Sequence, residues 1–321
     1  MKLRTLTAGG SLTALLCLTA ACGGSPSGAD GPDDYSIGIV QFSSSDETSE
    51  RVIQGYVEYA EDQGWEYSKV DPQGSVDKAI SAMNDFVQKG VDAIVVSVFP
   101  SESLTAGIRA ATAADIPVIS IVGGTADGVP MSADAGRPNA EEISELLVEE
   151  MGGTGDLLVL GFSAGLPCVG REEELMDALD GTDIELTREE VPIPGQVEAG
   201  NRVAQAWLAE HQKGSGPLSI WGCFDDPALG AVSALRQARR DDVLVFGING
   251  TPAAIRAVRA GDMRATAFAD AIGVGRSLAE QTPSVIEGGP GADARDVPLP
   301  TYLVTIESFD DFAKAHPEAI G

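Results

Sequence analysis

The chain is poor in basic residues and in histidine. It carries 21 Lys and Arg against 49 Asp and Glu over 321 residues, which gives a formal charge of −28. That much negative charge argues against nucleic acid as a partner and against purely electrostatic adhesion to anionic lipid. The two histidines, His211 and His316, stand far from any cysteine spacing that zinc would need. We therefore expect neither a metal nor another cofactor.

Residues 1–21 are typical of a secretory signal. Lys2 and Arg4 give a positive start, and the apolar run 12–18 is too short to span a bilayer. Small residues then surround Cys22. We expect an exported protein.

The end of this segment resembles a bacterial lipoprotein signal, in which Leu, a small residue and Ala or Gly precede the lipidated cysteine. Leu18 stands one place early, and Thr19 occupies the usual Leu position. Cys17 fits less well because Leu16 precedes it. We expect lipid attachment at Cys22, on the outer face of the cytoplasmic membrane. Ordinary secretion of a soluble product is the alternative.

Residues 22–34 are mostly Gly, Ser, Pro, Ala and Asp, a composition that predicts a flexible tether. Loss of residues 1–21 removes only two bases and leaves 19 against 49 acids, a formal charge of −30. The remaining chain of about 290 residues exceeds one average core, so two lobes are expected.

From Tyr35 onward, strand-like apolar runs alternate with helical patterns. This order predicts βαβ units with right-handed crossovers and parallel sheets, here as two doubly wound α/β halves in series. The predicted strands are 37–40, 67–70, 93–98, 117–121, 157–160, 184–191, 218–221, 243–248 and 265–268. The predicted helices are 49–63, 76–89, 104–114, 141–151, 172–179, 197–211, 228–239 and 253–260.

Ligands of such folds lie beyond the carboxyl ends of the strands. The informative residues there are Pro-Val-Ile-Ser-Ile at 117–121, Asp-Asp-Pro-Ala-Leu-Gly-Ala at 225–231 and Val-Phe-Gly-Ile-Asn-Gly-Thr-Pro at 245–252. Their order and spacing resemble the type I periplasmic binding proteins, most closely the ribose-type sugar-binding subunits of ABC importers. The similarity runs from about residue 37 to residue 304.

The resemblance implies two Rossmann-like lobes, joined by three crossings and closing on a small ligand like a hinge. Mapped onto this chain, lobe one is 35–133 plus 270–298, and lobe two is 134–269 plus 299–321.

The resemblance also implies ligand contacts. Arg171 matches an arginine whose guanidinium offers paired donors to ligand oxygens, although the run Glu-Glu-Glu-Leu at 172–175 lacks the Gly-Phe pair that usually follows three residues later. An ion pair between Arg171 and its acidic neighbours is the alternative. Asn249 stands where the family usually has Asp, and its amide can accept and donate.

Other ribose contacts are missing. The loop 43–49 holds no aromatic residue, Val-Gly-Gly at 122–124 replaces an Asp-Arg pair, Phe224 replaces an Asn, and Ala269 replaces a Gln. The candidates that remain at strand ends are acids and aromatics: Asp46, Asp134, Asp225, Asp270, Phe99 and Phe224. Such a set suits a neutral sugar or polyol, while Trp65 and Trp207 are expected in the core.

Cys168 and Cys223 follow strands of the second lobe, in loops that this fold would place together at the cleft. Outside the cytoplasm two such cysteines usually pair. Closing the loop would stabilise the fold by about 4 kcal/mol in the chain-entropy model. Two buried free thiols are the alternative.

A rival pattern is Gly-Phe-Ser-Ala-Gly at 161–165, which fits the G-x-S-x-G of a nucleophile elbow around Ser163. An elbow serine is followed directly by a helix, whereas residues 166–170 with Pro167 predict a loop here. Only His211 or His316 could complete a triad. We therefore expect no catalytic residues.

The sequence thus predicts a lipid-anchored, monomeric solute-binding protein of an ABC importer. We expect it to bind a sugar or polyol and to dock on permease subunits. A surface sensor of the same fold is the alternative. A repressor is excluded because an export signal stands where a DNA-binding helix pair would be.

Overall fold

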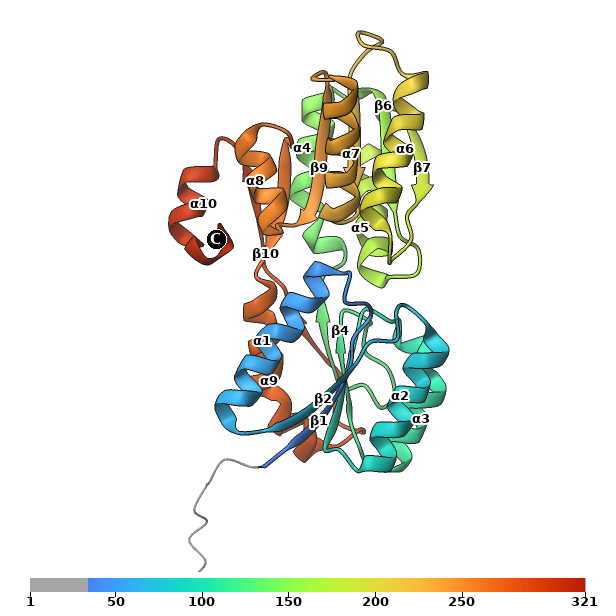
Figure 1. The fold of residues 1–321 in the computed structure, drawn as a ribbon, viewed down its shortest axis with the longest axis vertical. Coiled ribbons are helices and arrows are strands. Elements are labelled where there is room, and N and C mark those ends of the chain that lie inside the picture. The colour runs from blue at the N-terminus through green and yellow to red at the C-terminus, as the bar shows by residue number, and fades with distance from the viewer. Residues whose placement is uncertain (1–33, 321) are drawn as a thin grey trace, which may run out of the picture. The chain divides into compact units, whose positions relative to one another are not determined.

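The computed structural model describes residues 34–320. The predicted signal, Cys22 and all but the last residue of the predicted tether lie outside them. Two six-stranded sheets organise the described chain, each flanked by helices (Figure 1). This confirms the predicted architecture of two α/β lobes. In the described part of the chain, no helix is both long and apolar enough to cross a membrane.

The first lobe is built on a fully parallel sheet. Its strands are β1 (Ser36–Val40), β2 (Glu66–Val70), β3 (Ala93–Ser97), β4 (Val118–Ile121), β5 (Met131–Asp134) and β11 (Arg295–Pro298). Their order is β11-β5-β4-β3-β1-β2. Its helices are α1 (Glu47–Gln63), α2 (Val76–Lys89), α3 (Thr105–Ala113) and α9 (Ala271–Gly288).

The second lobe repeats this plan. Its strands are β6 (Thr154–Gly161), β7 (Asp183–Glu190), β8 (Leu218–Gly222), β9 (Val243–Asn249), β10 (Ala265–Ala269) and β12 (Thr301–Thr305). Their order is β12-β10-β9-β8-β6-β7, and only the β10–β12 pair is antiparallel. Its helices are α4 (Glu141–Met151), α5 (Leu166–Leu179), α6 (Gln196–Glu210), α7 (Asp225–Ala238), α8 (Pro252–Ala260) and α10 (Phe309–Ala315).

The chain passes between the two sheets three times: from β5 to β6, from β10 to β11 and from β11 to β12. This is the number of crossings that the resemblance implies. Every predicted strand and helix is present. The predicted ranges lack β5, β11, β12, α9 and α10.

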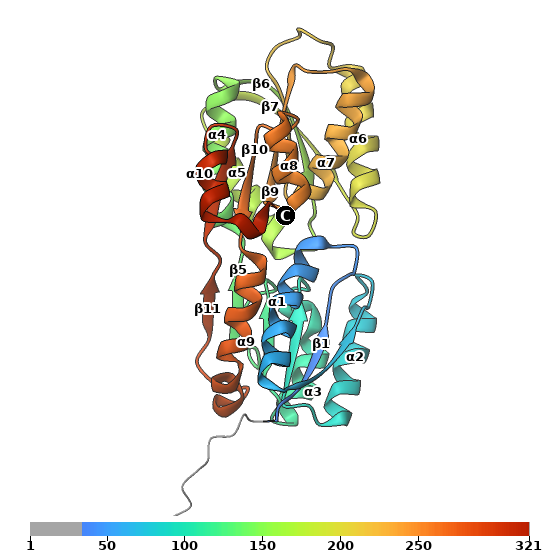
Figure 2. The ribbon, with the colours of Figure 1, turned by 60° about the vertical axis from the view of Figure 1, so that its left-hand side comes forward.

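Alternating apolar residues let the first sheet pack on both faces. Ile37 and Ile39 belong to the same buried cluster as Tyr56 of α1, whereas Ile94 belongs with Phe86 of α2. This alternation follows from the two-residue period of a strand. Accordingly α1 and α9 cover one face and α2 and α3 the other (Figure 2).

Glycines allow the closest helix contacts in both lobes. A Cβ on Gly55 of α1 would come within 2.0 Å of Ile272 O in α9, and one on Gly275 within 1.9 Å of Val52 O. In the second lobe, a Cβ on Gly230 of α7 would come within 2.2 Å of Val197 O in α6. The backbones approach so closely that no side chain fits between them.

Replacing Gly230 tests this packing. In a helix interior, Gly→Ala normally stabilises by up to about 1 kcal/mol. Here we expect Gly230→Ala to destabilise by about 1–3 kcal/mol, because the new methyl group pushes α6 and α7 apart. Thermal unfolding would show a lower midpoint. The control is Gly291→Ala, where a Cβ meets nothing within 4 Å; equal midpoints for the two variants would contradict the steric argument.

Candidate functional site

A pocket lies between the lobes, where the three crossings meet the carboxyl ends of the strands. Ala133, Ala135, Ala269, Ala271 and Leu299, all at or beside the crossings, form part of its wall. The cavity volume is about 70 Å³. A single water needs about 15 Å³, so the pocket admits a small molecule.

The start of α1 brings acidic and hydroxyl groups to the pocket from the first lobe. Asp46 caps the helix by accepting a hydrogen bond from the backbone N–H of Ser49 at 3.4 Å. Burial, together with the negative charge of Asp226 across the cleft, raises the pKa of Asp46 to about 7. Thr48 and Ser49 line the pocket beside it.

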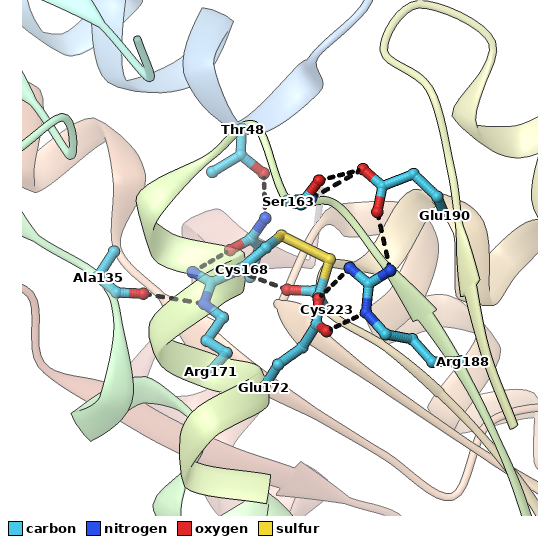
Figure 3. Close-up of a disulfide and its surroundings, with 10 residues drawn as sticks. Thr48, Ala135, Ser163, Cys168, Arg171, Glu172, Arg188, Glu190 and Cys223 are labelled. Atoms are coloured by element: carbon cyan, nitrogen blue, oxygen red, sulfur yellow. Dashed lines mark hydrogen bonds and ion pairs between the residues drawn. A yellow bond between two sulfur atoms is a disulfide. The ribbon is translucent and has the colours of Figure 1, made fainter. Parts of the chain in front are cut away.

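Arg171 brings a buried guanidinium from α5 (Figure 3). Its Nε donates to Ala135 O at 2.8 Å, and its Nη1 donates to Cys223 O at 2.8 Å. Its Nη2 donates to Asn249 Oδ1 at 3.0 Å. Burial lowers the pKa of Arg171 to about 10, so the group stays charged at neutral pH. Among the described residues, two of its five N–H groups have no partner and remain available to a ligand.

Asn249 connects the two lobes. While its oxygen accepts from Arg171, its Nδ2 donates to Thr48 Oγ1 at 2.8 Å. Gln196 makes a second bridge, donating from Nε2 to Ser45 O at 2.6 Å and to Asp226 Oδ2 at 2.8 Å. The two lobes are therefore held together by hydrogen bonds at the pocket.

Three non-glycine residues of the pocket wall have positive φ. Asn249 has φ 116°, Val98 has φ 65° and Val122 has φ 60°. A β-branched residue in this region is strained, and such strain gathers at functional sites. Val98 directly follows β3, and Val122 directly follows β4.

The predicted pairing of Cys168 with Cys223 is confirmed. Figure 3 shows the bond beside Arg171. The loop predicted at 166–170 is wrong, because α5 already begins at Leu166 and carries Pro167 in its first turn. A proline there loses no hydrogen bond, since the first N–H groups of a helix have no partner within it. Cys168 thus ties the start of α5 to the residue after β8.

Four of the eight predicted ligand residues line this pocket: Asp46, Arg171, Phe224 and Asn249. Asp134 is exposed at the end of β5 and lines an adjoining hollow together with Asp296 and Ser132. The other three predicted residues, Phe99, Asp225 and Asp270, are absent from the lining of both.

Each of those three has another role. Phe99 packs on Phe42 with ring centroids 4.7 Å apart. Asp225 is fully buried and accepts hydrogen bonds from Thr251 N and Thr266 Oγ1, both at 2.7 Å; burial raises its pKa to about 7. Asp270 caps α9 by accepting from Gly273 N at 2.9 Å.

The sequence reasoning missed most of the wall. Thr48 and Ser49 belong to the segment 43–49, from which only Asp46 was predicted to contact a ligand. The wall also contains Val52, Val98, Ile121, Val122, Phe162, Ile193 and Val274. Position after a strand could have indicated Val98, Val122 and Phe162, but apolar residues carry no chemical signal of their own. Trp65 and Trp207 are buried, as predicted.

Among the described residues, Ser163 bonds a carboxylate and no histidine. Its Oγ donates to Glu190 Oε1 at 2.9 Å, and its backbone N–H donates to the same oxygen at 2.8 Å (Figure 3). His211 stacks on Trp207, and His316 packs among Phe268, Tyr302 and Phe312. Within residues 34–320, no cluster of three or more His, Cys, Asp or Glu could hold a metal ion.

Residues 37–290 match the family model of the periplasmic binding protein domain. The chain therefore belongs to the periplasmic binding protein family, and its resemblance to the type I members is confirmed. It is 27% identical over 259 residues to a putative rhizopine-binding protein of Rhizobium meliloti. The aligned region covers 75% of this chain and 80% of that protein.

Two further similarities agree. The chain is 26% identical over 257 residues to a xylitol-binding protein of Mycolicibacterium smegmatis, covering 77% of this chain and 71% of that protein. Its fold is similar to the solved structure of an ABC transporter solute binding protein from Agrobacterium vitis with bound allitol. The TM-score is 0.80 at 22% identity, covering 88% of this chain and 98% of that one.

The raised pKa of Asp46 predicts a pH dependence of stability. Between the ordinary pKa of 3.8 and about 7, the folded protein keeps a proton that the unfolded chain has released. The free energy of unfolding contributed by Asp46 therefore falls as the pH rises through this window. Asp46→Asn keeps the helix cap but removes the titration. The thermal unfolding midpoint of the native protein should therefore fall relative to that of the variant as the pH rises. We expect the difference, variant minus native, to grow by at least about 3 °C between pH 5 and pH 8.

Asp311→Asn serves as the control. A hydrogen bond from Lys314 lowers the pKa of this exposed carboxylate, so its removal should give a flat or falling difference over the same range. A flat difference for Asp46→Asn as well would show that Asp46 is ionised in the folded protein throughout.

Proposed function

We propose that the protein is the extracytoplasmic substrate-binding subunit of an ABC importer, anchored by lipid at Cys22, and that it delivers a small sugar or polyol to permease subunits. The observation that carries this proposal is the hydrogen-bonded series Thr48–Asn249–Arg171, which joins the two lobes at a buried pocket. We place the lobes at 35–133 plus 270–298 and at 134–269 plus 299–321.

Capture by closure follows from this arrangement. Each lobe supplies part of the wall, so a ligand contacts both lobes only when they are together. A ligand that binds the closed form more tightly shifts the population toward it. The closed, loaded form then presents a surface to the permease that the open form lacks. The protein itself performs no chemistry in this cycle.

The polar groups of the pocket support a sugar or polyol as ligand. A guanidinium with two available N–H groups, a carboxyl group and the Thr48 hydroxyl can pair with neighbouring hydroxyls of a ligand. Phe162 and Phe224 provide apolar faces for C–H groups. Two relatives, a putative rhizopine-binding protein and a xylitol-binding protein, support a small solute of this kind.

Arg171→Lys tests the site without removing its charge. A lysine cannot present a planar fork to Ala135 O, Cys223 O and Asn249 together. We expect binding of the ligand found in a panel of pentoses, hexoses, inositols and linear polyols to weaken at least about tenfold, which is about 1.4 kcal/mol. Isothermal titration calorimetry on the chain from Gly23 onward would measure this.

Arg188→Lys is the matched control. Arg188 is exposed and pairs with Glu172 and Glu190 on the outer surface of the second lobe (Figure 3). This variant should bind as the native protein does. Equal affinities for the two lysine variants would place the ligand elsewhere, and no binding by the native protein to any member of the panel would overturn the sugar or polyol proposal.

Lipid attachment is tested by labelling. In a bacterial host that processes lipoproteins, the full chain should incorporate an alkyne-tagged fatty acid, and Cys22→Ala should abolish the label because no thiol remains at the processing site. Cys17→Ala should still be labelled. An unlabelled native protein, or a label lost only in Cys17→Ala, would contradict the proposed anchor.

A further inference from the structure

The polar side chains of the pocket are gathered into one group. They are Asp46, Thr48 and Ser49 at the start of α1, and Arg171 and Asn249 from the second lobe; we call these five the polar cluster. Its members are contiguous, because Asn249 bonds Thr48 at 2.8 Å and Arg171 bonds Asn249 at 3.0 Å. Asp46 and Ser49 belong to the same helical turn as Thr48.

The rest of the pocket wall is apolar. It consists of alanine, valine, isoleucine, leucine, proline and phenylalanine side chains, a glycine and the disulfide-bonded Cys168. Both lobes contribute, the first with Val98 and Val122 and the second with Phe162 and Phe224. No side chain of this apolar wall can donate or accept a strong hydrogen bond.

The polar cluster has limited capacity. The Asn249 oxygen and amide nitrogen each already have a partner, and the Ser49 hydroxyl is bonded to Ser97. Two N–H groups of Arg171, the Asp46 carboxyl group and the Thr48 hydroxyl remain the main groups for a ligand. These can serve the hydroxyls on one edge of a small ring or chain.

A hydroxyl that faces the apolar wall gives up its water and gains no partner. The cost of one such group is about a tenfold loss of affinity, or about 1.4 kcal/mol. A methyl group or hydrogen at the same position pays no such cost, and a methyl group gains from leaving water. A ligand with hydroxyls on every side therefore fits this pocket worse than one that is polar on one side only.

We propose that the pocket selects sugars or polyols that carry hydroxyls along one edge and deoxy or O-methyl groups on the opposite side, with Phe224 as a specificity-determining residue. The inference rests on the proposed function, since it names the ligand class of the same pocket. Phe224 sets the preference because it belongs to the apolar wall and directly follows Cys223, whose carbonyl oxygen bonds Arg171.

Matched pairs of ligands test the proposal on the chain from Gly23 onward. The probes are D-galactose with 6-deoxy-D-galactose, D-ribose with 5-deoxy-D-ribose, and myo-inositol with its mono-O-methyl ethers. Titration calorimetry should show at least one deoxy or O-methyl compound binding about tenfold tighter than its hydroxylated parent. Parents that bind as tightly as, or tighter than, every modified partner would overturn the inference while leaving the proposed function intact. No binding by any probe would also overturn the inference, whereas the proposed function would fall only if the whole panel of pentoses, hexoses, inositols and linear polyols failed to bind.

Two substitutions separate polarity from size. Phe224→Asn places an amide in the apolar wall and should move the affinity ratio at least about tenfold toward the hydroxylated parent. Phe224→Leu keeps the wall apolar and should retain the native ratio. If both variants move the ratio equally, Phe224 does not set the preference through its polarity, and that part of the proposal fails.

Discussion

The buried guanidinium of Arg171 is the constraint on which the pocket depends. Burying a charged group is costly unless its hydrogen-bond donors are satisfied and its charge is balanced by opposite charges. Arg171 obtains its three bonds from Ala135 at the first crossing, from Cys223 after β8 and from Asn249 at the end of β9. Because the partners belong to three separate segments, satisfying one side chain fixes all three. The disulfide from Cys168 joins two elements of the same wall.

The acids around Arg171 complete the electrostatics. Asp225, Asp46 and Asp134 all favour its charged form, while burial favours the neutral one. Burial also raises the pKa of Asp46 and of Asp225 to about 7. Arg171 therefore stands near two carboxyl groups, Asp46 and Asp225, whose raised pKa values leave them partly protonated near neutral pH. Such a balance suits an uncharged ligand with hydroxyl groups better than a strongly ionic one.

Much of the fold could be predicted because apolar residues repeat with the periods of strands and helices. β5 and β11 were missed because half of the four residues in each are polar, so neither forms an apolar run. The start of α5 was misjudged for a different reason. Pro167 was interpreted as a helix breaker, but in the first turn its fixed φ suits the helix and its missing N–H costs nothing.

The site was less predictable than the fold. Arg171 and Asn249 could be predicted because their polar groups stand in recognisable patterns, whereas Asp225 has the same kind of pattern but bonds Thr251 and Thr266 in the interior. Position after a strand fixes where a residue lies, not which way its side chain points.

The apolar wall is harder still, since Val98 and Phe224 are far apart in the sequence and carry no chemical mark. The two parts of the pocket also do different work. The polar contact between Thr48 and Asn249 crosses from lobe to lobe, and in the proposed function it would couple binding to closure. The apolar residues would decide which shapes and substituents fit. Under that proposal, a change in the apolar wall would alter the choice of ligand while leaving the contact between Thr48 and Asn249 in place.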